Sequence, residues 1–258
     1  MSVDQGNDFA HLFHASDPPR EEVGLAQVDA GRQKLFGALR THAGGHELAE
    51  NFAILAFGHI PSVSNDLRSL PEVYQIVPDS LYVLTTLTSA FLHADIWHLG
   101  GNMLFIWVFG DNVEDALGHI KYTIFYLTCA FAAAWFHAFV FPDSDAPLIG
   151  ASGAAAGIVA AYLMLHPKMK VWVLFLSKIP LRLSALWLLG GWVVFQLIMF
   201  LVDAEEKISW AAHVGGIVAG VALVGILKRR DVPLFDREIV PPHAVEVDET
   251  ETIHWGRQ

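Results

Sequence analysis

Apolar segments long enough to cross a bilayer fill much of residues 81–227, and they restrict the fold more than any other feature. Charged residues make up only 17% of the chain, against about 25% in an ordinary soluble domain. A helix needs about 20 apolar residues to span a membrane. We therefore predict an all-α, polytopic helical bundle with five spans, at residues 95–113, 121–141, 151–166, 183–202 and 208–227.

The charges between these spans predict the orientation of the bundle. The segment 166–182, around an apolar patch that we expect at the membrane interface, carries Lys and Arg, as does 228–230 after the last span. The opposite turns, 142–147 and 203–206, are acidic. The positive-inside rule then places the C-terminus in the cytoplasm and the start of the third span at the outer surface.

The two ends of the chain differ from the centre. Residues 1–80 are polar and acidic without a sustained period, and the tail 229–258 is acidic and proline-rich. We expect both ends to be poorly ordered, flanking a membrane domain at 81–228. A single cysteine, Cys129, excludes a disulfide framework, and a net charge of -11 gives no support for nucleic-acid binding.

Residues 150–157, Gly-Ala-Ser-Gly-Ala-Ala-Ala-Gly, begin the third span and carry one hydroxyl, Ser152. Small residues allow a neighbouring helix to come close, and the first turn of a helix has unpaired backbone N–H groups. On this segment alone Ser152 is either a packing residue or a nucleophile beside its oxyanion donors.

The fifth span runs parallel to the third and carries His213 about one turn from its start. Both side chains should lie at a similar depth, and small residues on each span (Gly153 and Gly157, Gly216 and Gly220) favour a close crossing. An ionisable residue inside a span indicates a functional site. A neutral histidine there can act as general base for a serine, although a purely structural hydrogen bond is the alternative.

His98 and Asn102 are four residues apart and therefore share one face of the first span. Both can donate a hydrogen bond to a developing oxyanion, or they form a structural pair. We expect His93 to be structural, and the spacing of His93, Asp95 and His98 does not favour a metal site. Glu114 and Asp115, at the other end of this span, are expected to anchor the following turn through Gly118.

Four motifs in this order resemble the rhomboid family of intramembrane serine proteases over about residues 85–228. They are Phe91-x-His93-x4-His98-x3-Asn102-Met103, Gly110-x3-Glu114-x3-Gly118, Gly150-Ala151-Ser152-Gly153 and Ala212-His213-x2-Gly216-x3-Gly220.

The resemblance implies a Ser152–His213 dyad without a third carboxylate. It implies an oxyanion hole formed by His98, Asn102 and backbone at Ser152 and Gly153. Glu114 would be a structural glutamate. The implied substrates are transmembrane segments of other proteins, cut near small or helix-destabilising residues, with no cofactor or metal. The implied location is a bacterial plasma membrane.

Two departures from the family pattern stand out. The family core has six spans, but no span precedes residue 80 here, so we expect either a different start of the reading frame or loss of the first span. Some members also place an aromatic residue one turn after the serine, where this chain has Ala156.

Two other functions remain open from the sequence. A catalytically silent rhomboid-like protein would bind transmembrane clients, but such relatives typically lack the Ser/His pair. A transporter using His98, Asn102 and His213 as a polar pathway predicts internal repeats, which the sequence does not show.

Overall fold

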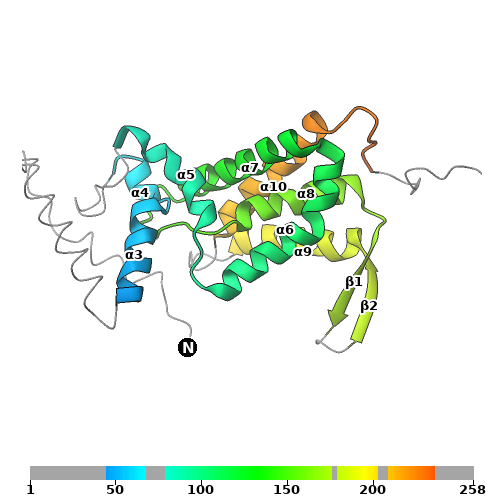
Figure 1. Ribbon diagram of the computed structural model, residues 1–258, viewed down its shortest axis with the longest axis horizontal. Helices are drawn as coiled ribbons and strands as arrows, with labels where there is room; N and C mark the ends of the chain where they lie inside the picture. Colours follow the sequence, from blue (N-terminus) through cyan, green and yellow to red (C-terminus); the bar gives the residue numbers. More distant parts are fainter. Residues whose placement is uncertain (1–44, 68–78, 176–178, 203–208, 236–258) are drawn as a thin grey trace, which may run out of the picture.

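The computed structural model describes residues 45–67, 79–175, 179–202 and 209–235, and Figure 1 shows a bundle of helices with a β-hairpin at one end. A helix lies at each of the five predicted spans, which confirms the predicted helical membrane fold. The five are α6 (Ile96–Leu117), α7 (His119–Val140), α8 (Ser152–Leu165), α9 (Ala185–Val202) and α10 (Trp210–Leu227).

Helix α8 lies at the centre of the bundle and contacts α6, α7, α9 and α10. Its side chains from Gly153 to Tyr162 are all buried, although the helix has only 14 residues. A helix that is apolar all round belongs in the interior of a bundle. The residue that begins α8, Ser152, is therefore held on a helix buried among four others.

Glycines bring α8 and α10 into backbone contact. A Cβ built on Gly216 or Gly220 would overlap the carbonyl oxygen of Gly153 or Gly157, respectively. On the other side of α8, a Cβ on Gly157 would lie 2.7 Å from the Sγ of Cys129 on α7. The small residues thus lie at the helix crossings, where close approach leaves no room for a side chain.

Among the described residues, α7, α9 and α10 are long and apolar enough to cross a membrane. Helix α8 is shorter, and α6 carries Asp111, Glu114 and Asp115 in its last turns. Large apolar side chains face outward, with Trp107 and Trp187 each 78% exposed. Such an exposed apolar surface is suited to lipid rather than water.

Part of the N-terminal segment is ordered, contrary to the sequence expectation. Helices α3 (Gly45–Phe57) and α4 (Pro61–Ser64) precede residue 80, and α3 runs across the end of the bundle in Figure 1. His59 forms a β-bridge with Leu148, and the Ser62 hydroxyl donates to Asp145 over 2.7 Å. These contacts fix the segment to the α7–α8 connection, and such tertiary contacts are not visible in local periodicity.

Short helices link this segment to α6: η2 (Asp79–Leu84), α5 (Thr85–Thr88) and η3 (Ser89–Phe91). Threonine hydroxyls tie them together, since the Thr85 hydroxyl donates to the carbonyl of Tyr82 over 2.7 Å and Thr88 to that of Phe57 over 2.6 Å. The result is a packed layer at the Ser152 end of the bundle.

The basic segment after α8 forms a β-hairpin of β1 (Lys170–Phe175) and β2 (Ile179–Ser184). The strands are antiparallel, with Trp172 opposite Arg182, whose guanidinium lies 5.7 Å from the indole centroid. An apolar patch at the membrane interface was predicted here within an all-α fold, and the hairpin departs from that prediction. The β-branched and aromatic residues of β1 favour strand and were the available signal.

The first residues after α10 also make contacts, although the tail from 229 was expected to be poorly ordered. The Arg229 N–H donates to the carbonyl of Ala116 over 2.9 Å, and that of Phe235 to Met164 over 2.7 Å. The segment 228–235 lies at the same end of the bundle as the hairpin (Figure 1). The rest of the tail lies outside the described residues.

Candidate active site

The backbone just before Ser152 turns at Gly150. This residue has φ +116, a conformation open to glycine but strained for other residues. Its N–H donates to the carbonyl of Ser89 over 2.9 Å, which ties the loop to η3. The chain then turns into α8, whose first residue is Ser152, so that Ser152 belongs to the first helical turn, where backbone N–H groups have no partner within the helix.

His213 lies directly against Ser152. Its Nε2 is 2.9 Å from the Ser152 Oγ, within hydrogen-bond distance. The contact depends on the crossing of α8 and α10 at Gly153 and Gly216, one residue after Ser152 and three after His213. The structure therefore brings together the two residues predicted as nucleophile and base, whose catalytic roles stay a prediction.

A third side chain, which was not among the predicted site residues, contacts the other ring nitrogen of His213. Gln196 on α9 places its Oε1 2.7 Å from the His213 Nδ1 and is only 3% exposed. The sequence contains a signal that could have identified it. Gln196 is the one side-chain amide in an otherwise apolar span, and polar residues inside a span usually mark a functional site.

Two tryptophans flank the imidazole of His213. The Trp192 ring centroid lies 6.4 Å away and that of Trp210 lies 6.0 Å away in an edge-on arrangement. Ala156, one turn after Ser152 on α8, provides no aromatic ring to pack against the histidine. The aromatic rings beside His213 come instead from α9 and α10.

His98 and Asn102 lie over Gly150, two residues before Ser152. A Cβ on Gly150 would lie 2.7 Å from the His98 Nε2 and 3.7 Å from the Asn102 Nδ2. Asn102 is buried, and its Nδ2 has no hydrogen-bond partner among the described residues. A buried donor without an acceptor is costly and is available for an oxyanion at this position.

The start of α6 fixes the backbone that carries His98. Asp95 is the N-cap, and its Oδ1 accepts from the N–H groups of Trp97 over 2.7 Å and His98 over 2.8 Å. His93 packs edge-on against His98 with centroids 5.2 Å apart, and burial, then the nearby His98, lower the pKa of His93. These contacts hold the start of α6 and the two histidines together, and the structural role of His93 stays a prediction.

Metal binding at this end of the protein gains no support from the geometry. Within the described residues, no three His, Cys, Asp or Glu side chains come together as ligands could. The capping role of the Asp95 carboxylate accounts for its place beside the two histidines.

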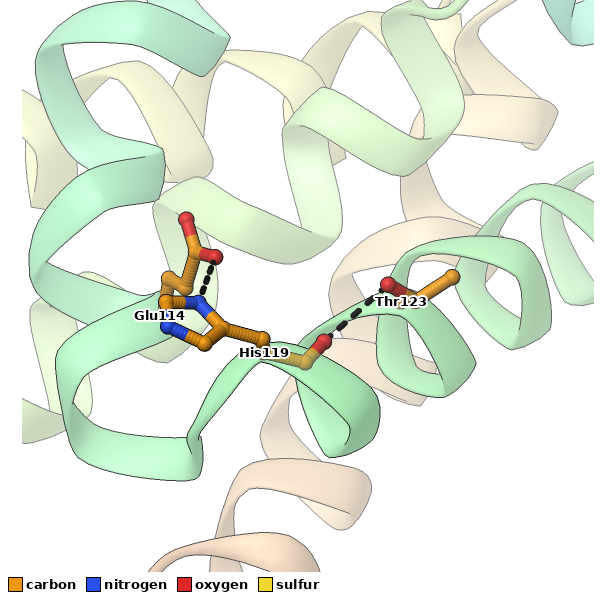
Figure 2. Close-up of polar contacts among 3 residues, drawn as sticks. All are labelled: Glu114, His119 and Thr123. Atoms are coloured by element: carbon orange, nitrogen blue, oxygen red, sulfur yellow. Dashed lines mark hydrogen bonds and ion pairs between the residues drawn. The ribbon is translucent and has the colours of Figure 1, made fainter.

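Glu114 and Gly118 lie at the opposite end of α6, away from Ser152. Gly118 joins α6 to α7 at φ +86, and its N–H donates to the Glu114 carbonyl over 2.6 Å. The Glu114 carboxylate lies 2.5 Å from the Nδ1 of His119, and the Thr123 hydroxyl donates to the His119 carbonyl over 3.0 Å. Figure 2 shows both contacts. These residues hold the α6–α7 turn and do not contact the Ser152–His213 pair.

The fold and the arrangement at Ser152 define a polytopic helical membrane protein with a serine–histidine pair between its helices. A sequence model of the rhomboid domain matches residues 80–230, and the chain belongs to the rhomboid family.

Three similar proteins illustrate the relationship. Rhomboid protein 1, mitochondrial, of Saccharomyces cerevisiae is 31% identical over 54% of this chain and 40% of its own length. RHOMBOID-like protein 12, mitochondrial, of Arabidopsis thaliana is 31% identical over 57% of this chain and 47% of its own length. Presenilin-associated rhomboid-like protein A, mitochondrial, of Danio rerio is 28% identical over 72% of this chain and 49% of its own length. The chain thus spans less than half the length of these relatives.

The predicted location in a bacterial plasma membrane, with a cytoplasmic C-terminus, is wrong. The names of these relatives place them in mitochondria. The prediction failed because neither the family resemblance nor the charge pattern of the loops, which predicts only an orientation, says which membrane holds the chain.

Proposed function

We propose that this protein is an intramembrane serine endopeptidase that hydrolyses peptide bonds in or near transmembrane segments, in a mitochondrial membrane. The observation that carries the proposal is the 2.9 Å contact between the Ser152 Oγ and the His213 Nε2. A hydroxyl in hydrogen-bond contact with an imidazole is the usual arrangement of an activated serine nucleophile.

In the proposed reaction the Ser152 Oγ attacks the scissile carbonyl carbon while its proton passes to the His213 Nε2. The oxyanion accepts hydrogen bonds from Asn102, His98 and the backbone N–H groups at Ser152 and Gly153, of which the unpartnered Asn102 Nδ2 is the best supported. The imidazolium returns the proton to the leaving amine. Water then hydrolyses the acyl-enzyme with His213 as base again.

The proposed substrates are single transmembrane segments, which reach the site from the bilayer. The exposed apolar surface of α9 supports entry from the lipid, and peptide bonds must leave the helical conformation before a nucleophile reaches them. Segments with Gly or other helix-destabilising residues are therefore the preferred class. The proposed partners are these substrates and the lipid bilayer, and no cofactor is required.

Labelling with a serine-reactive fluorophosphonate tests the proposal. The purified chain in detergent is compared with Ser152→Ala and His213→Ala. We expect label on the parent chain only. Ser152→Ala should unfold at the parental temperature, whereas His213→Ala, which leaves the buried Gln196 amide without its partner, should remain folded but unfold at a lower temperature. Equal labelling of all three proteins would refute the protease function and leave the catalytically silent, client-binding alternative.

A further inference from the structure

Gln196 is unusual among the residues of α9. The helix reads ALWLLGGWVVFQLIMFLV, so that Gln196 is its one side-chain amide, and many of its neighbours face outward. Gln196 instead faces the interior and is 3% exposed. Burying an amide without a partner costs a few kcal/mol, so a buried amide is expected to have a hydrogen-bond partner. The partner of Gln196 is His213.

The contact determines which nitrogen of the His213 ring carries the hydrogen. The Gln196 Oε1, 2.7 Å from Nδ1, is a carbonyl oxygen and can only accept a hydrogen bond. Nδ1 therefore carries the hydrogen of the neutral imidazole. The other nitrogen, Nε2, is left with its lone pair toward the Ser152 Oγ at 2.9 Å, which is the form that can accept the serine proton.

We propose that Gln196 is a positioning residue that completes a Ser152–His213–Gln196 chain and holds His213 in its reactive tautomer. This inference rests on the proposed protease function and deepens it. Without the amide oxygen, the neutral ring can carry its hydrogen on Nε2, and an Nε2 that already carries a hydrogen cannot accept the serine proton. A neutral histidine has two such tautomers, and the hydrogen bond to one nitrogen selects between them.

The neighbours of Gln196 and His213 restrict the ring as well. Trp192 lies four residues before Gln196 on α9 and therefore on the same face of the helix, and Trp210 lies on α10. Both rings border the imidazole, at 6.4 Å and 6.0 Å. The imidazole is thus bordered by two indoles and has a hydrogen-bond partner at each of its two nitrogens.

A neutral amide suits this buried position better than a carboxylate. A carboxylate between helices would have to be desolvated at a cost of several kcal/mol, whereas an amide selects the same tautomer with a smaller penalty. It gives no charge stabilisation to the imidazolium, however. We therefore infer that Gln196 acts on the tautomer and orientation of His213 rather than on its basicity.

Two substitutions at Gln196 test the inference, with one control on the same helix. Gln196→Met keeps a similar length and removes the acceptor, while Gln196→Glu keeps an acceptor and adds a charge. Leu197→Met is the control, because Leu197 is 40% exposed on the neighbouring face. The measurements are kcat and KM for a transmembrane substrate, the rate of fluorophosphonate labelling from pH 5 to 9, and the thermal midpoint.

We expect Gln196→Met to lower kcat and the labelling rate roughly thirtyfold with little change in KM, the effect of losing one buried hydrogen bond. Gln196→Glu should retain activity, with the acid limb of its pH profile about one unit higher, because a carboxylate beside Nδ1 favours the imidazolium. His98 on α6 and His137 on α7 also lie within electrostatic range of His213, and they are unchanged in every variant. Leu197→Met should match the parent.

Parental kcat in a folded Gln196→Met would overturn the inference, as would a pH profile of Gln196→Glu superimposable on that of the parent. If Gln196→Met does not fold, the pH profile of Gln196→Glu decides alone. Failure of the protease function itself gives a different result. The parent then shows no Ser152-dependent labelling, and the role of Gln196 is refuted with it.

Discussion

The crossing of α8 and α10 can be tested at Gly216, which has no room for a side chain. A Cβ there would overlap the carbonyl oxygen of Gly153, and real Cβ atoms essentially never lie within 3.0 Å of such an atom. Gly216→Ala should therefore push the two helices ~1 Å apart, since the packed backbones cannot give way locally. The Ser152 Oγ and His213 Nε2, now 2.9 Å apart, would separate to roughly 4 Å, beyond hydrogen-bond reach.

Two opposing terms set the expected loss of stability. Overpacking costs about 3 kcal/mol when the clash cannot relax, and alanine recovers about 1 kcal/mol through its higher helix propensity. The free energy of unfolding should fall by about 2 kcal/mol. A misplacement of this size between nucleophile and base should also lower the labelling rate of Ser152 on the order of 100-fold.

The matched control is Gly225→Ala on the same helix, where a new Cβ meets nothing within 4 Å. It should be neutral or slightly stabilising and should label at the parental rate. Thermal unfolding followed by circular dichroism and fluorophosphonate kinetics, both in detergent, measure the two effects. If Gly216→Ala unfolds and labels like the parent, the account of the helix contact is wrong.

Three further predictions concern residues outside the crossing. Burial, with a smaller contribution from His137, lowers the pKa of His59 from 6.5 to about 4. Because the unfolded chain then binds the proton more tightly, the free energy of unfolding should fall by roughly 3 kcal/mol as pH falls from 6.5 to 4. In His59→Gln the thermal midpoint should depend less on pH. Gly118→Ala should cost about 1 kcal/mol because Gly118 has φ +86, whereas Gly191→Ala, with open space around it, should not. Asp95→Ala removes the N-cap of α6, so it should lower the free energy of unfolding by about 1 kcal/mol and also lower kcat. Asp95→Asn keeps an acceptor and should show the parental stability and kcat.

The bundle could be predicted from the sequence because its signals are local. Five apolar segments correspond to α6 through α10, and the glycines at 153, 157, 216 and 220 indicated where helices approach closely. The pairing of Ser152 with His213 followed from depth and direction, because parallel spans bring equivalent positions together.

The features that were not predicted depend on contacts between distant segments. Helix α3 and the residues after it are held by the α7–α8 connection, through Leu148 and Asp145, and their own sequence has no strong period. Gln196 becomes informative only when α9 and α10 are placed side by side. The hairpin was overlooked because its lysines and apolar residues fit an interfacial patch equally well.

Cleavage of defined transmembrane segments in reconstituted vesicles tests the central claim most directly. The purified chain, Ser152→Ala and His213→Ala are each incubated with a single-span protein whose segment contains Gly and with a matched all-Leu segment, in water enriched in oxygen-18. Mass spectrometry should find one cut in the Gly-containing segment by the parent only, with oxygen-18 in the new carboxyl group. A folded parent that cuts neither segment, or variants that cut as fast as the parent, would contradict the account.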